Sequence, residues 1–164
     1  FKATDIIIIS NPVRSADGLH SVRRILSITE VRKHWEKDPL VEKGFVDLMK
    51  YNPELDRLEI TDDLKNGDSE VFKSIASRVK GWAGNWDAVW ENIVLRSKIK
   101  ERMVDLANEL NKLELLEADV VVRSNDIFHK ISEEVYNKLE KYDNNEIYKK
   151  WDEWFIEYAE KKRL

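Results

Sequence analysis

The sequence predicts an α+β fold, with N-terminal β-hairpins of about four strands followed by a C-terminal region of about four helices. Residues 5–31 contain two strand-like runs around an Asp-Gly pair, a strong hairpin signal because Gly tolerates the positive φ of such turns. From Asp68 onward, apolar residues recur at every third or fourth position, the period of an amphipathic helix. We therefore expect a β-rich segment over residues 1–64 and a helical region over residues 65–164.

The first predicted strand, residues 6–9, consists only of isoleucine, a pattern that usually means burial on both faces inside a larger sheet. Because so little chain precedes it, we expect this polypeptide to be the tail end of a larger protein. A turn at residues 16–19 leads into the second strand. In the second hairpin, Pro53 fixes φ and the neighbouring Asn and Asp close the turn. The four predicted strands cover residues 6–9, about 20–32, 44–50 and 58–61.

Helix-capping residues and glycines divide the remainder of the chain. Asp68 or Ser69 is suited to cap the first helix, Asn85 the second and Ser124 the third. The first predicted helix ends before Gly81, and the second extends from Asn85 to about residue 113 or 116. The third follows Ser124, and the last covers residues 146–162. Residues 115–122 stay ambiguous, because their three consecutive valines either extend the long helix or lead into the next turn.

Composition narrows the classes of function. The net charge of −4 gives no basic footprint for nucleic acid. No run approaches the 18 or so apolar residues of a membrane-spanning helix, so we expect no direct insertion into a membrane. The absence of Cys excludes disulfides and Cys-ligated metals.

Catalytic motifs do not occur in the sequence. It has no Gly-x-x-x-x-Gly-Lys-[Ser/Thr] loop to hold phosphates, and no Gly-x-Gly-x-x-Gly, Gly-x-Ser-x-Gly or His-Glu-x-x-His. His20, His34 and His129 are far apart in sequence, which does not suggest a metal site. We predict no catalytic, cofactor-binding or metal-binding residues in this chain.

Two groups of residues are candidates for contact with a subunit or partner. Arg23 and Arg24 either face a neighbouring subunit or a phosphate, or lie on opposite faces of a strand, with one arginine in solvent and the other paired to Glu30 or Asp17. The aromatic residues either pack in a helical core or form a docking surface. The candidate contact residues are Arg23, Arg24, Trp82, Trp86, Trp151 and Trp154.

The N-terminal half resembles a known family. Residues 5–9, a turn, and Ser21-Val22-Arg23-Arg24-Ile25-Leu26-Ser27-Ile28-Thr29-Glu30-Val31 resemble the last strands of the ATPase core in archaeal type II/IV secretion ATPases. These hexameric motors drive pilus and archaellum assembly. Tyr51-Asn52-Pro53-Glu54-Leu55-Asp56 is similar to the Tyr-Asp-Pro-x-x-Asp that follows an apolar strand in the family. The resemblance continues where the helical region opens at Ser69, and thins after about Leu110.

The resemblance implies that this chain is the C-terminal fragment of a homo-hexameric secretion ATPase. Its role is then to complete the core and to contact other subunits, and also a membrane platform protein. ATP and Mg²⁺ bind upstream in the family, so no cofactor is expected in this chain, which should be inactive alone. The implied location is cytoplasmic, with membrane association through partners.

The alternative is a free-standing helical interaction module with a Trp-rich docking surface. The strand at residues 6–9 distinguishes the two, because in a fragment it would be unpaired or recruit another chain. In a self-contained module, it would lie at the centre of its own sheet.

Overall fold

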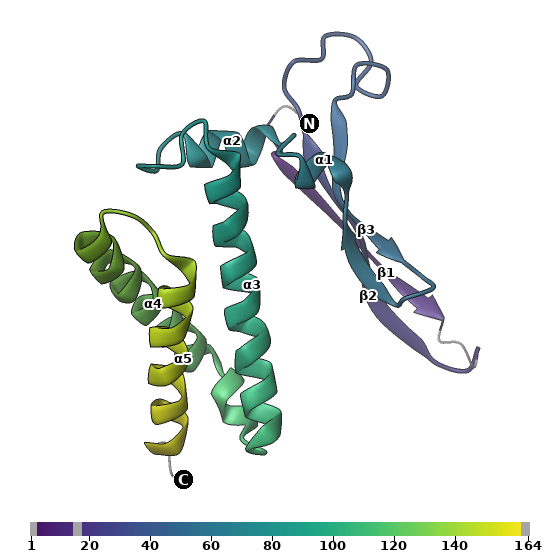
Figure 1. Ribbon diagram of the computed structural model, residues 1–164. Helices are drawn as coiled ribbons and strands as arrows, with labels where there is room; N and C mark the ends of the chain where they lie inside the picture. Colours follow the sequence, from purple (N-terminus) through teal and green to yellow (C-terminus); the bar gives the residue numbers. More distant parts are fainter. Residues whose placement is uncertain (1–2, 15–17, 162–164) are drawn as a thin grey trace. The chain divides into compact units, whose positions relative to one another are not determined.

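The computed structural model describes residues 3–14 and 18–161, and it has the α+β fold that the sequence predicts (Figure 1). A four-stranded antiparallel sheet comes first and helices follow. The elements are β1 (Ile6–Arg14), β2 (Ser21–Val31), β3 (Phe45–Asn52), β4 (Arg57–Ile60), α1 (Asp62–Lys65), α2 (Glu70–Ala76), α3 (Trp86–Glu109), the 3₁₀ turn η1 (Leu113–Leu116), α4 (Ala118–Leu139) and α5 (Asn144–Lys161). The chain forms two compact units, Phe1–Ala88 and Val89–Leu164, called here the sheet unit and the helical unit.

The sheet has the order β1-β2-β3-β4, so β1 lies at an edge. This corrects the expectation that residues 6–9 are buried on both faces, since Ile8 is 57% and Ile9 is 45% exposed. Strand β1 is also longer than expected and continues through polar residues to Arg14. Part of the predicted turn at residues 16–19 lies outside the described residues.

The strand registers place one apolar row across the whole sheet. Ile8 lies opposite Ile28, Ile28 opposite Met49, and Met49 opposite Ile60. Directly opposite residues share a face of the sheet, so these four side chains form a row across all four strands. Glu30 lies two residues from Ile28 and therefore on the same face.

Two short helices cover the Glu30 end of this face. Thr61 starts α1 by accepting a hydrogen bond from the Leu64 N–H, and Leu64 is buried where α1 packs beside β3 (Figure 1). With four residues, α1 is too short to show a helical period, and so sequence reasoning missed it. Ser69 caps α2 as predicted, because its Oγ accepts from the Phe72 N–H at 3.2 Å.

The helical unit has a continuous apolar core. Trp151 and Phe155 of α5 are fully buried and their rings stack at 5.0 Å. Helix α5 begins at Asn144, before the predicted start at residue 146, and the Asp143 carboxylate accepts hydrogen bonds from the N–H groups of Asn145 and Glu146 in its first turn. The core residues from the other elements are Leu95, Ile99, Met103, Leu106, Ala107, Leu115, Val120, Phe128, Ile131 and Val135.

The prediction that Ser124 caps a helix is wrong, because α4 begins six residues earlier, at Ala118. Ser124 lies buried inside the helix, where its Oγ accepts a hydrogen bond from the Trp151 indole N–H at 3.1 Å. Serine is found both at helix caps and inside helices, where its hydroxyl can bond to a neighbouring helix. The residue type alone therefore does not distinguish the two roles. The ambiguous valines at residues 120–122 belong to the start of α4.

Candidate functional site

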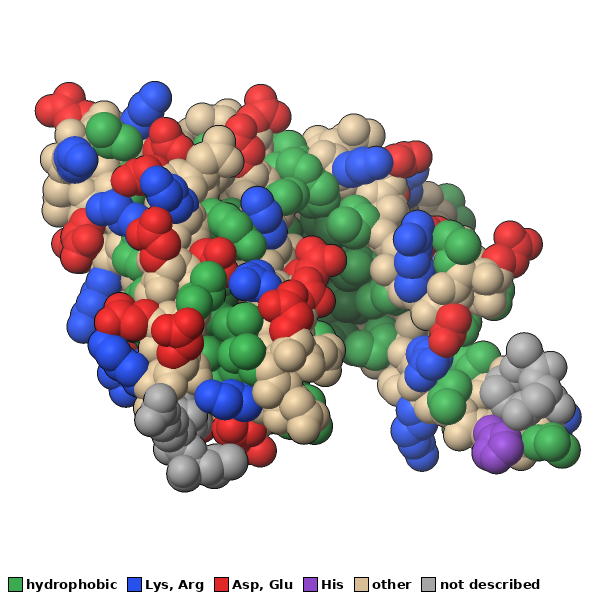
Figure 2. All heavy atoms as spheres, turned by 60° about the horizontal axis from the view of Figure 1, so that its bottom comes forward, with side chains coloured by type: hydrophobic (Ala, Val, Ile, Leu, Met, Phe, Trp, Pro, Cys, Tyr) green, Lys and Arg blue, Asp and Glu red, His purple; other side chains and the backbone are tan. Residues whose placement is uncertain are grey.

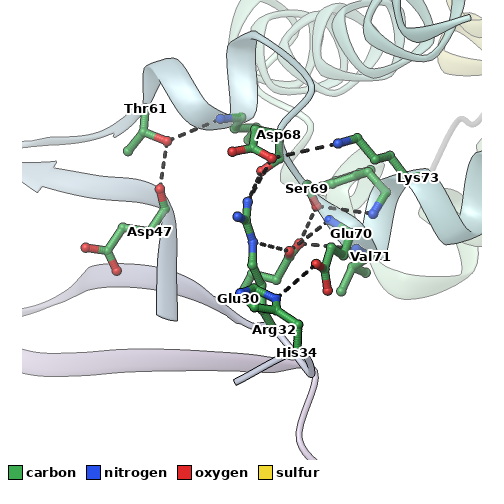
Figure 3. A network of polar contacts seen from close by, with 12 residues as sticks. Glu30, Arg32, His34, Asp47, Thr61, Asp68, Ser69, Glu70, Val71 and Lys73 are labelled. Carbon is green, nitrogen blue, oxygen red and sulfur yellow. Dashed lines mark hydrogen bonds and ion pairs between the residues drawn. The ribbon is translucent and has the colours of Figure 1, made fainter. Parts of the chain in front are cut away.

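A buried carboxylate occupies the end of the sheet covered by α2. The Glu30 side chain is fully buried and accepts hydrogen bonds from the Ser69 hydroxyl, the Glu70 N–H at 2.8 Å and the Val71 N–H at 3.2 Å. Figure 3 shows these donors converging on the Glu30 carboxylate from the first turn of α2. Because helix N-termini leave N–H groups unpaired, Glu30 of β2 acts as a second cap for α2, added to that of Ser69.

Arg32 extends this cluster toward the loop before α2. Its guanidinium lies between Glu30 and Asp68 (Figure 3), with Nε 3.7 Å from a Glu30 oxygen and Nη2 2.9 Å from a carboxylate oxygen of Asp68. The hydrogen bond from Arg32 lowers the pKa of the Asp68 carboxyl. Burial alone would lower the pKa of Arg32, but the contacts with Asp68 and Glu30 more than offset it and raise that pKa.

This cluster is suited to stabilise the fold rather than to catalyse a reaction. The Glu30 carboxylate is fully buried among donors of its own chain, so it is not accessible to act as a base or nucleophile. A hollow of about 300 Å³ lies beside Arg32. Its charged lining residues are balanced in sign: Arg32, Lys43, Lys50, Asp47, Asp63 and Asp68. The charges of these side chains therefore sum to zero.

The open edge of β1 is the second candidate site. Along a strand of an antiparallel pair, the backbone N–H and C=O groups of successive residues point alternately toward the partner strand and away from it. The Val31 N–H donates to the Asp5 carbonyl at 2.9 Å, so the backbone groups of Asp5 face β2. By this alternation, Ile6 and Ile8 present their N–H and C=O groups to the open edge.

The apolar row next to this edge is only partly covered. Ile8 is 57% and Ile60 is 44% exposed at the two ends of the row, while Ile28 and Met49 are half-buried between them. Covering one exposed isoleucine fully contributes up to about 1.5–3 kcal/mol, so such a row favours a packing partner. The sheet therefore offers a strand edge and an apolar face side by side.

The two arginines of β2 lie on opposite faces of the strand. Arg24 binds the Asp56 carboxylate through two hydrogen bonds of 2.7 Å each, and the Tyr51 hydroxyl donates to the same carboxylate at 2.7 Å. These bonds hold the pKa of Asp56 far below its ordinary value. The predicted pairing with Glu30 is wrong, because Glu30 faces Arg32 and α2; Asp17 lies outside the described residues. Arg23 is exposed.

The tryptophans named as contact candidates are covered to different degrees. Trp151 has no exposed surface and belongs to the core. Trp154 is half-buried and stacks on Tyr158 at 5.4 Å. Trp82 and Trp86 are half-buried in the sheet unit, where the Trp86 indole N–H donates to the Lys65 carbonyl at 3.0 Å. The indole of Trp151, at least, is not available to a partner.

Among the described residues, no group of three or more His, Asp or Glu side chains is placed to hold a metal ion. His34 lies 3.5 Å from a Glu70 oxygen in the sheet unit, and His129 contacts Arg96 in the helical unit. None of the helices in residues 3–14 and 18–161 is long and apolar enough to cross a membrane.

Comparison with known proteins found no matching family model. No curated protein and no solved structure is significantly similar to the chain.

Proposed function

We propose that this chain is the C-terminal part of a hexameric secretion or pilus-assembly ATPase. In that motor the sheet unit closes the ATPase core and contributes to contacts between subunits, while the nucleotide is bound elsewhere. The partners are the other subunits of the homo-hexameric motor and a membrane platform protein. The observation that supports this proposal is the open, apolar edge of β1.

Protection of this edge is confined to one half of the strand. Soluble proteins blunt their edge strands with charges, prolines or bulges, because an open edge pairs with other chains. Pro12 and an irregular register between Ile9 and Ser10 protect the second half of β1. Residues 6–9 have neither, and no charged side chain lies between Asp5 and Arg14. A neighbouring strand of an ATPase core would pair with this stretch and cover Ile8.

Cross-linking from the open edge tests the proposal. A photoreactive amino acid replaces Ile8 in the protein expressed in its native cells. After irradiation, mass spectrometry identifies the cross-linked peptide. We expect a peptide from a polypeptide that carries a phosphate-binding loop, which this sequence lacks. The matched control is Leu40, which is 78% exposed in the same unit and lies outside the sheet. Attachment only to proteins without such a loop, or equal attachment from Leu40, would contradict the proposal.

Nucleotide binding gives an independent test. Titration of ATP and Mg²⁺ into the isolated chain should produce no binding signal, because the sequence has no Gly-x-x-x-x-Gly-Lys-[Ser/Thr] loop to hold phosphates. Saturable ATP binding by the chain alone would overturn the assignment of the nucleotide site to another part of the motor.

A further inference from the structure

The helical unit contains an apolar groove between α3 and α4. The groove has a volume of about 300 Å³. Its apolar walls come from Ile99, Met103, Val121, Val122 and Phe128. Val121 and Val122 are 42% and 61% exposed, so one wall is open to solvent. Figure 2 shows hydrophobic side chains among interspersed acidic and basic ones on the face of the helical unit that it draws.

A half-buried cation lines the same groove and has no carboxylate partner among the described residues. The Arg96 guanidinium lies over the Phe128 ring, 4.7 Å from its centroid. Its other contacts in the described structure are uncharged side-chain oxygens, Asn92 Oδ1 at 3.1 Å and Asn125 Oδ1 at 3.4 Å, and the His129 ring nitrogen at 3.3 Å. Burial lowers the pKa of Arg96, and no nearby carboxylate raises it.

Other buried or half-buried arginines of the chain differ from Arg96 in this respect. Arg32 is paired with Asp68, and Arg102 lies 3.0 Å from an oxygen of Asp152. A guanidinium removed from water gains most from a carboxylate that it binds through two parallel hydrogen bonds. Arg96 therefore has an unused capacity for an acidic group at the wall of an apolar groove. Exposed Lys100 adds a second positive charge to the lining.

We infer that this groove binds an amphipathic helix of a partner protein, with its apolar residues between α3 and α4 and an Asp or Glu paired with Arg96. Helices bind in grooves of this kind through apolar residues three or four positions apart, and charge complementarity sets their orientation. The inference rests on the helical unit alone and does not depend on the function proposed for the sheet unit.

A displayed peptide library provides a probe that does not require the natural partner. The library consists of amphipathic helical peptides whose apolar stripe and flanking charges are randomised, and it is selected on the full chain. We expect the enriched peptides to carry Asp or Glu beside the stripe. Arg96→Gln should weaken their binding by about tenfold, the loss expected for one charge-assisted contact.

Two variants separate the groove from the rest of the surface. Val122→Asp places a negative charge in the open wall and should abolish binding of the acidic peptides without disturbing the core, since Val122 is exposed. Lys130→Gln removes an exposed charge that does not line the groove, and should leave binding unchanged. Enrichment of neutral or basic peptides, no enrichment, or full binding by Val122→Asp would overturn the inference. If the chain dimerises and Val122→Asp prevents this dimerisation, the groove binds a second copy of the chain, and the inference of a separate partner helix is overturned.

Discussion

Replacement of Glu30 by Ala should destabilise the sheet unit strongly, because the Glu30 carboxylate is fully buried. The change removes the acceptor of three donors, the Ser69 hydroxyl and the N–H groups of Glu70 and Val71. Breaking a buried charge pair by removing one partner costs about 3–5 kcal/mol. Because Arg32 keeps its ion pair with Asp68 at 2.9 Å, we expect the lower part of that range, about 3 kcal/mol.

Two measurements distinguish this local effect from general loss of stability. Urea unfolding followed by circular dichroism gives the free energy of unfolding, and hydrogen exchange gives the protection of individual segments. The amides of Glu70 and Val71 should exchange faster in Glu30→Ala, because they lose their acceptor. Glu30→Gln keeps one acceptor oxygen and should lose about half as much stability, because its amide group now faces other donors.

Glu54 provides the matched control for this experiment. It is an exposed glutamate in the turn between β3 and β4, so Glu54→Ala should leave both the unfolding free energy and the exchange of α2 unchanged. If Glu30→Ala behaved like Glu54→Ala, or if α2 kept its protection, the role of Glu30 as a cap for α2 would be refuted.

Three further predictions concern other contacts. Trp151→Ala should lower the free energy of unfolding by about 3–5 kcal/mol, because the indole is fully buried; an unchanged urea midpoint would contradict this. Asp68→Asn should reduce the loss of stability between about pH 6 and pH 2, measured by thermal melting. Arg32 lowers the pKa of the Asp68 carboxyl below its ordinary 3.8, so the ionised carboxyl stabilises the fold above that value and this stabilisation is lost as the pH falls. Arg24→Ala should leave the melting temperature unchanged, because its pair with Asp56 is exposed; a clear decrease would show that the pair holds the second hairpin.

Local sequence signals predicted those features that depend on residues close together in the chain. The second hairpin lies where the strand and turn residues indicated it, and Asn52 closes the turn by accepting a hydrogen bond from the Glu54 N–H. Ser69, one of the two predicted caps, caps α2, and Asp143 caps α5 close to the predicted start of the last helix. Each of these features depends on contacts within three residues of the chain, so neighbouring sequence contains the information.

Long-range contacts explain what the sequence did not predict. Arg24 meets Asp56, 32 positions away, because strand pairing brings the end of β3 beside the middle of β2. Glu30 was a candidate partner for one of the two arginines at positions 23 and 24, yet its carboxylate oxygens accept from α2, about 40 positions further on. The groove beside Arg96 forms only once α4 packs near α3, so periodicity along either helix does not reveal it.

Residue type alone also misjudged which apolar side chains are covered. Trp151 was a candidate contact residue and has no exposed surface, whereas Ile8 was expected in a sheet interior and is 57% exposed. The difference lies in the number of neighbouring elements. Trp151 packs where α5 meets α4, while β1 pairs with β2 on one side and has no strand of the described chain on the other. A run of isoleucine therefore does not by itself predict an interior strand, because burial depends on the elements that pack on both faces and not on residue type alone.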